Sequence, residues 1–150
     1  MSSEGTICRK NDTSYSSERD LVDCFLQQIM VGSPWGDVRV STEFNYYRGK
    51  TDVIVIDVSG RVIAVEAKLS NWRKALEQAH RNLCFANSSY VLMPKKAAQH
   101  ALKNSASFTK CNVGICYVDD CLVILQESTL SQPIQPWLSE RATNVLTSEC

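Results

Sequence analysis

Apolar residues near the start of the chain recur at the spacing of one helix face. They occur at helical intervals between residues 17 and 31, at Leu21, Val22, Phe25, Leu26, Ile29 and Met30. Ser17 stands immediately before this pattern, and Asp20 takes the place of the glutamate that commonly completes a helix cap. Glycine and proline within residues 32–36 end the pattern. These features predict a helix over residues 17–31.

Three extended segments follow, at residues 38–47, 51–58 and 61–69, and β-branched and aromatic residues are frequent in them. The second and third segments each contain an uninterrupted run of apolar residues, which indicates strands that are covered on both faces. Ser59 and Gly60 lie between these two runs and predict a hairpin turn.

The rest of the chain alternates between helical and extended patterns. Helical spacing returns over residues 71–86 and 95–104, and short strands are predicted at residues 89–93, 113–118 and 122–126. Short turns between the early strands require antiparallel pairing, whereas helical connections between the later strands require parallel pairing. The sequence therefore predicts an α/β fold in which a mixed central sheet is flanked by helices.

The two ends of the chain differ in character from its middle. Residues 1–16 are rich in small polar and charged residues and are expected to form a flexible tail. Residues 17–126 carry the periodic patterns and are expected to form one domain. Residues 127–150 are predicted to be a C-terminal extension that includes a short helix at residues 137–146.

Composition and charge narrow the class of protein. The 150 residues are 44% hydrophobic, as in an ordinary soluble domain. Sixteen basic and 16 acidic residues give a formal net charge of +0, which excludes a polybasic nucleic-acid coat but not a local basic surface. No stretch approaches the roughly 18 apolar residues of a membrane helix, and the first 20 residues lack the apolar core of a signal peptide. We therefore expect a cytoplasmic protein with no membrane partner.

The seven cysteines are scattered and odd in number, which favours reduced thiols over a disulfide framework. Cys111, Cys116 and Cys121 are five positions apart, which does not match the usual spacing of zinc ligands. Cys84 lies four positions after His80, but a helix brings residues at that spacing together by default. A cysteine-based enzyme and a zinc site are therefore disfavoured.

Two acidic residues and a lysine stand at the ends of the second and third predicted strands. Asp52 opens the second strand, and Glu66 and Lys68 lie two positions apart near the end of the third, where they share one face. Because their neighbours are apolar, these charges must be paired, bound to a metal or placed at the edge of a cleft. Mg²⁺ or Mn²⁺ prefers oxygen ligands such as Asp52, Glu66 and the carbonyl of Ala67, and Lys68 can position or activate a water. An exposed ion pair between Glu66 and Lys68 is the alternative.

The hairpin turn decides whether the two carboxylates meet. A strict two-residue loop at Ser59-Gly60 places Asp52 opposite Ala67, so that its side chain points away from Glu66. A three-residue loop or a single bulge instead places Asp52 opposite Glu66 or Lys68. The apolar runs hide which residues face which side, so the sequence is compatible with both arrangements.

The order of these elements resembles the PD-(D/E)XK nuclease superfamily, which has the restriction-endonuclease-like fold. The resemblance rests on Asp52 in TDVIV and on Glu66 and Lys68 in VEAKL, and it covers roughly residues 17–126. It implies an αβββαβ core, followed here by a further helix and two short strands. It also implies a DNA nuclease that uses Mg²⁺ or Mn²⁺ and leaves 5′-phosphate ends.

The resemblance also points to residues outside the Asp52–Glu66–Lys68 set. It implies that Glu18, on the first helix, joins the metal site, that Gln78 lines the site, and that Glu43 matches a glutamate of several small members. Thr51 replaces the proline of the motif, and Asn82 stands where some exonuclease-type relatives have tyrosine. The resemblance does not distinguish an active enzyme from a catalytically inactive protein of the same fold.

Basic residues near this segment are candidate contacts for nucleic acid. Lys74, Gln78 and Arg81 fall on one face of the predicted helix, and three further candidates are Arg48, Lys50 and Arg73. A solvated charged rim is the alternative for the arginines and lysines.

These observations support two hypotheses for the function. The first is a nuclease that acts on duplex, branched or single-stranded DNA, as a homodimer or as part of a larger assembly. The second is a catalytically inactive module of the same fold that binds nucleic acid or a protein partner.

Overall fold

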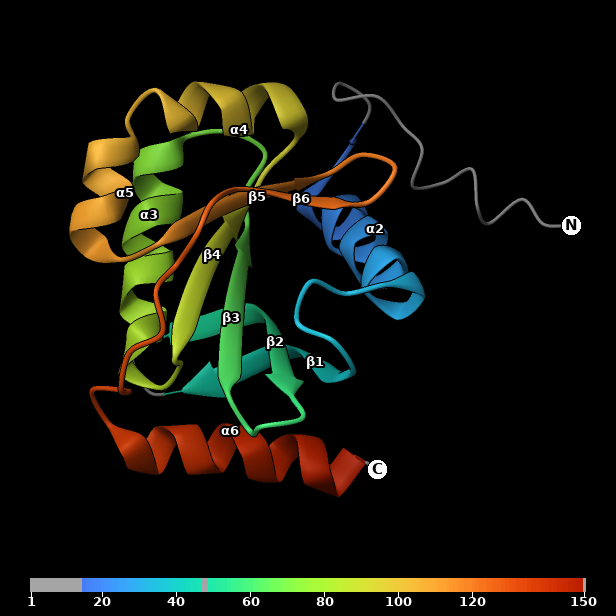
Figure 1. The fold of residues 1–150 in the computed structure, drawn as a ribbon, viewed down its shortest axis with the longest axis vertical. Coiled ribbons are helices and arrows are strands. Elements are labelled where there is room, and N and C mark those ends of the chain that lie inside the picture. The colour runs from blue at the N-terminus through green and yellow to red at the C-terminus, as the bar shows by residue number, and fades with distance from the viewer. Residues whose placement is uncertain (1–14, 47–48, 150) are drawn as a thin grey trace, which may run out of the picture.

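A six-stranded mixed sheet forms the centre of the molecule (Figure 1). The computed structural model describes residues 15–46 and 49–149. The strands lie side by side in chain order, as β1 (Val38–Tyr46), β2 (Gly49–Asp57), β3 (Val62–Ala67), β4 (Ser88–Leu92), β5 (Gly114–Val118) and β6 (Leu122–Gln126). Strand β4 pairs in parallel with β3 and β5, and the other neighbouring strands are antiparallel. The expected α/β class and mixed sheet are confirmed.

Helices cover both faces of this sheet. Helix α2 lies on one side, and α3 and α5 lie on the other (Figure 1). The helical elements are α2 (Glu18–Val31), α3 (Trp72–Arg81), the 3₁₀ turn η1 (Asn82–Cys84), α4 (Lys95–Leu102), α5 (Ser105–Cys111) and α6 (Pro136–Glu149). None of the helices within the described ranges is both long and apolar enough to cross a membrane.

Helix α2 begins where the capping pattern predicts. The side chain of Ser17 accepts a hydrogen bond from the backbone N–H of Asp20 at 3.1 Å, which satisfies a donor that the first helical turn leaves unpaired. The apolar stripe of the helix, including Leu21 and Phe25, is fully buried against the sheet. The cluster that it forms includes Val65 and the other residues of β2 to β5 that face α2.

The opposite face of the sheet carries two clusters. One cluster joins α3, α4 and α5 to Val91 and Ile115 of the central strands. The other, here called the lower cluster, is formed by Phe44, Tyr46, Ile54, Ile56, Val62, Ala64, Cys84, Phe85, Ala86, Leu138 and Ala142. The lower cluster joins the β2–β3 hairpin to α6, and its strand residues Ile54 and Ala64 each lie two positions from one of the two candidate carboxylates, Asp52 and Glu66.

The structure differs from the sequence expectations in the helices α3 and α5 and in the length of β3. The helix expected over 71–86 ends at Arg81, because the next residues are nearly all buried and tighten into η1. Helix α5 was not predicted, since Phe108 is its only fully buried residue and gives no apolar stripe. The third predicted strand, expected to reach residue 69, ends at Ala67. The predicted tail over residues 1–16 falls almost entirely outside the described residues.

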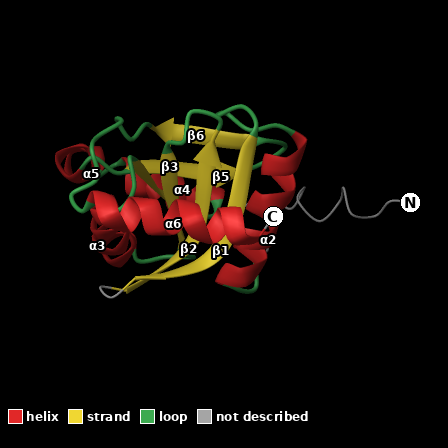
Figure 2. Ribbon diagram, turned by 90° about the horizontal axis from the view of Figure 1, so that it is seen from below, coloured by secondary structure: helices red, strands yellow, loops and turns green. Residues whose placement is uncertain are grey.

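The segment after residue 126 contributes two residues of α6 to the lower cluster. Helix α6 spans Pro136–Glu149, longer than the helix expected at 137–146, and packs against β1 and β3 (Figure 2). Leu138 and Ala142 are both 0% exposed in the lower cluster. The backbone N–H of Gln135 donates to the carbonyl of Cys84 at 2.7 Å, which ties the approach to α6 to η1.

Replacing Leu138 by alanine is expected to lower the free energy of unfolding by about 2–5 kcal/mol, because the change leaves a cavity in the lower cluster. Urea denaturation followed by circular dichroism measures this change. Leu130→Ala is the matched control, since Leu130 is 51% exposed, and it should change stability by less than about 0.5 kcal/mol. Equal effects of the two substitutions would show that α6 adds little to the core.

Candidate active site

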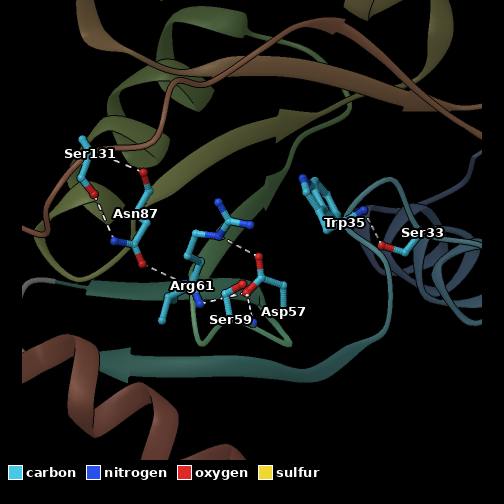
Figure 3. Close-up of polar contacts among 8 residues, drawn as sticks. Ser33, Trp35, Asp57, Ser59, Arg61, Asn87 and Ser131 are labelled. Carbon is cyan, nitrogen blue, oxygen red and sulfur yellow. Dashed lines mark hydrogen bonds and ion pairs between the residues drawn. The ribbon is translucent and has the colours of Figure 1, made fainter.

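The loop of the β2–β3 hairpin has three residues, 58–60. The backbone N–H of Asp57 donates to the carbonyl of Arg61 at 3.1 Å across its base. The Asp57 carboxylate accepts hydrogen bonds from Ser59 N, Arg61 N and Arg61 Nε, as Figure 3 shows. Burial alone would raise the pKa of Asp57, but these bonds offset it and hold the pKa below its usual range. Gly60 has a φ of 87°, which favours glycine at the end of the loop.

This loop places both candidate carboxylates on one face of the sheet. Ile54 of β2 pairs with Ala64 of β3, and both side chains belong to the lower cluster. Side chains two positions apart on a strand share a face, so Asp52 and Glu66 continue the same row beyond Ile54 and Ala64. The three-residue loop is one of the two arrangements that the metal hypothesis required. Asp52 therefore does not point to the reverse side of the sheet.

Each carboxylate is held by one hydrogen bond from the protein. Oδ2 of Asp52 accepts from the backbone N–H of Ala67 at 2.9 Å, across the hairpin. Oε1 of Glu66 accepts from Nδ2 of Asn82 at 3.0 Å. Asp52 is half-buried, whereas Glu66 is only 5% exposed. The two carboxyl groups are also close enough to hydrogen-bond with each other.

The electrostatics of this pair favour a shared proton. Burial, and after it the nearby charge of Asp52, raise the pKa of Glu66 to about 8. The hydrogen bond from Asn82 and the charge of Lys68 act in the opposite sense but do not offset the increase. At pH 7 the carboxyl group of Glu66 is therefore mostly protonated when no cation balances the pair.

Lys68 lies one residue beyond β3, and its side chain meets α2. Its backbone N–H donates to the carbonyl of Leu92 at 3.0 Å, so the chain stays paired with β4 at this point. Its Nζ lies 3.9 Å from Oε2 of Glu18, and the same oxygen accepts from the backbone N–H of Leu69 at 3.4 Å. Because Glu18 is exposed, we expect this ion pair to add little stability. It does bring the first helix to the end of β3.

A cavity of about 270 Å³ opens at this point. It is lined by every residue of the predicted catalytic set and by two of the predicted nucleic-acid contacts, namely Glu18, Asp52, Glu66, Ala67, Lys68, Gln78, Lys50 and Arg81. Lys50 and Arg81 are exposed, and they come from β2 and from the last residue of α3. The cavity therefore combines three acidic side chains with exposed basic side chains.

Glu18 does not form a three-residue ligand cluster with Asp52 and Glu66. Among residues 15–46 and 49–149, no three or more His, Cys, Asp and Glu side chains are grouped in a way that could hold a metal ion. Glu18 contacts Lys68 and the backbone of Leu69 instead. Its role as a metal ligand stays a prediction.

The other three predicted contacts for nucleic acid do not line the cavity or fall outside the described residues. Arg73 and Lys74 are exposed on α3 and do not line the cavity; the Arg73 guanidinium lies 4.6 Å from the ring centroid of Trp72. Their contact with nucleic acid stays a prediction. Arg48 falls outside the described residues.

Glu43 lines a neighbouring cavity of about 460 Å³ between α2 and β1, which it shares with Glu18 and Asp52. It is exposed and has a φ of 58°, an uncommon conformation for a residue other than glycine. The ladder between β1 and β2 pairs Thr42 and Phe44 but omits Glu43, which by register lies across from Asp52.

The cysteine alternatives gain no support from the structure. Cys84 is buried in the lower cluster whereas His80 is exposed. Cys116 is fully buried against α2, and burial together with the charge of Glu127 raises the pKa of its thiol. Cys111 packs in a different cluster and Cys121 is exposed, so these three cysteines do not form a ligand set.

Sequence reasoning did not identify the polar network around Asn82. Oδ1 of Asn82 accepts hydrogen bonds from Tyr46 OH and Thr51 Oγ1, both at 2.8 Å. Burial and then the charge of Glu66 raise the pKa of Tyr46 to about 12, so its hydroxyl stays a donor. The one available signal was an asparagine within an otherwise apolar segment, residues 82–86.

No known protein family has a model that matches this chain, and no curated protein matches its sequence. Among solved structures, the chain is similar to the SPO1766 protein of unknown function from Silicibacter pomeroyi, with a TM-score of 0.54 and 13% identity over 73% of this chain and 72% of that one. This likeness supports a shared fold.

Two other solved structures are less similar. A repair endonuclease from Pyrococcus abyssi has a TM-score of 0.45 and 15% identity over 70% of this chain and 47% of that one. SfsA from Pyrococcus furiosus, in complex with Ca²⁺, has a TM-score of 0.39 and 9% identity over 75% of this chain and 63% of that one. The chain thus spans less than two thirds of both proteins, and these likenesses assign no activity to it.

Proposed function

We propose that this protein is a nuclease that hydrolyses DNA phosphodiester bonds with a divalent cation bound between Asp52 and Glu66. The observation that carries the proposal is the direct approach of these two carboxyl groups within one cavity, beside Lys68. Two carboxylates at such short range repel each other, and burial adds to the cost. A cation removes this penalty, which is a reason for a folded protein to keep both groups.

The donor set suits a hard cation. Asp52 and Glu66 supply carboxylate oxygens and Ala67 supplies a backbone carbonyl, and Mg²⁺ or Mn²⁺ binds oxygen ligands of these kinds together with waters and phosphate oxygens. When bound, such a cation polarises the scissile phosphate and lowers the pKa of a bound water.

The remaining side chains of the cavity have complementary roles. Lys68 holds the attacking water or stabilises the negative charge that develops on the phosphate. Lys50 and Arg81 at the rim, together with the half-buried Gln78, contact the phosphates on either side of the scissile bond. Because the net charge of the chain is +0, the attraction for DNA is local, and it should weaken as salt is added.

Asp52→Asn is expected to abolish measurable cleavage of DNA, because it removes one of two anionic ligands while keeping the size of the side chain. The assay incubates branched, single-stranded and duplex DNA with the protein and Mg²⁺ or Mn²⁺, and follows the products on gels. Asp120→Asn is the control, since Asp120 is exposed after β5 and lies outside the cavity.

Equal cleavage by the Asp52→Asn and Asp120→Asn variants would point to another site or a contaminant. If folded wild-type protein cleaves none of the substrates, and neither cation raises its melting temperature, the proposal is wrong. The inactive module that binds nucleic acid or a protein partner would then be the better hypothesis.

A further inference from the structure

We infer that Asn82 is a positioning residue for the proposed cation site: its side-chain amide holds one oxygen of Glu66, so that the other oxygen is presented to a cation shared with Asp52. The inference rests on the proposed function, because it assumes that a cation binds between these two carboxylates. It starts from the hydrogen bond of 3.0 Å between Nδ2 of Asn82 and Oε1 of Glu66.

The orientation of the Asn82 amide is fixed from its other end. Tyr46 of β1 and Thr51 of β2 each donate to its Oδ1 at 2.8 Å, so both hydroxyl protons point at the same oxygen. A flipped amide would turn its carbonyl oxygen toward the carboxylate of Glu66, which is repulsive once that group is ionised. Asn82 therefore presents a donor, and not an acceptor, to Glu66.

The backbone of Asn82 is held as firmly as its side chain. Asn82 is 1% exposed, and its carbonyl accepts from the N–H groups of Phe85 at 3.1 Å and Ala86 at 3.0 Å. The ring of Phe85 packs edge-on against Phe44 and Tyr46, at centroid distances of 5.1 and 5.0 Å. These contacts anchor η1 to β1, so the amide cannot move away from Glu66 without disturbing the lower cluster.

The same division of oxygens is found in the second carboxylate. Oδ2 of Asp52 accepts from the backbone N–H of Ala67, as Oε1 of Glu66 accepts from Asn82. Each carboxylate thus has one oxygen oriented by the protein, and in the inferred site the other oxygen binds the cation in place of the proton that the pair shares without it. Partners that orient metal ligands in this way typically account for 10- to 100-fold in metal affinity.

The test measures the affinity of DNA-free protein for Mn²⁺ by electron paramagnetic resonance at one fixed pH, beside the melting temperature of each variant. Asn82→Ala is expected to weaken Mn²⁺ binding by about 10- to 100-fold. Thr51→Val is expected to weaken it several-fold, because it removes one anchor of the amide at a buried position that does not line the cavity. This second variant keeps the inference testable if Asn82→Ala does not fold.

Asn87→Ala provides the matched control. Asn87 is a second asparagine with structural hydrogen bonds, since it accepts from Val62 N at the start of β3 and donates to the carbonyl of Ser131 (Figure 3). Neither of these bonds involves Glu66. This variant should lower the melting temperature and leave the Mn²⁺ affinity of the folded protein unchanged.

Two outcomes would overturn the inference, and they can be told apart. If wild-type protein binds Mn²⁺ and the folded Asn82→Ala and Thr51→Val variants bind it equally well, Asn82 is merely structural and the proposed function stands. If wild-type protein does not bind Mn²⁺, both the inference and the proposed cation site are wrong.

Discussion

Lys68→Ala is expected to reduce the rate constant for DNA cleavage by about 10²- to 10⁴-fold, the range for removing a group that handles a proton or stabilises transition-state charge. Lys68 lies directly after β3 and lines the cavity with Asp52 and Glu66, and in the proposed mechanism its ammonium group acts on the reacting phosphate. Because it is a cation, it does not ligate the metal. Single-turnover cleavage at saturating Mg²⁺ measures the loss.

Two further measurements separate chemistry from binding in this variant. The Mn²⁺ affinity of Lys68→Ala should stay equal to or above that of wild type, since a positive charge beside the site has been removed. Lys110→Ala, an exposed lysine on α5, should cleave at the wild-type rate. Wild-type cleavage by Lys68→Ala would remove the lysine from the proposed chemistry.

The cation-free protein is expected to lose stability as the pH rises from about 5 to about 8. The pKa of Glu66 is about 8 in the folded protein and near 4.5 in an unfolded chain, so between these values only the folded state binds the proton. Stability falls with pH wherever the folded state holds more protons than the unfolded state. At about 1.4 kcal/mol per pKa unit, the loss amounts to a few kcal/mol.

Glu66→Gln isolates this effect, because glutamine has the same size and carries no charge. Urea denaturation of both proteins at pH 5.5 and pH 8.5, without divalent cations, should show a smaller loss of stability in the variant. Addition of Mg²⁺ at pH 8.5 should raise the stability of the wild-type protein again. The same addition should change the stability of the Glu66→Gln variant little. Parallel pH profiles for the two proteins would mean that the Glu66 carboxyl is not under strain.

The sequence predicted the order of the strands and the residues that line the cavity. It did not predict which face of the sheet the side chain of Asp52 lies on. Periodicity located α2, and Ser17 marked its start. The face on which Asp52 lies was hidden, because the strand segments of residues 53–56 and 62–65 are apolar at every position. The length of the hairpin loop decides that face, and it depends on the pairing of Asp57 with Arg61.

The role of Asn82 could not be predicted from local patterns. Its partners come from β1, β2 and β3, so the network exists only after the sheet has formed and η1 has packed on it. The length of helix α6 and its contribution to the core were underestimated for a similar reason. Over residues 136–144, whose side chains the structure describes, Leu138 and Ala142 are the buried residues, and their burial depends on the strands that α6 packs against.

The unusual backbone of Glu43 has a consequence for how copies of this protein can associate. Strand β1 is one of the two edge strands of the sheet, and its left-handed residue interrupts the regular zigzag of the peptide groups halfway along the strand. A second chain that docked there as an added strand would find acceptors and donors out of phase beyond this break. The β1 edge of the sheet is thereby protected from uncontrolled strand addition, and pairing of subunits beside β1 has to rely on helical or loop surfaces.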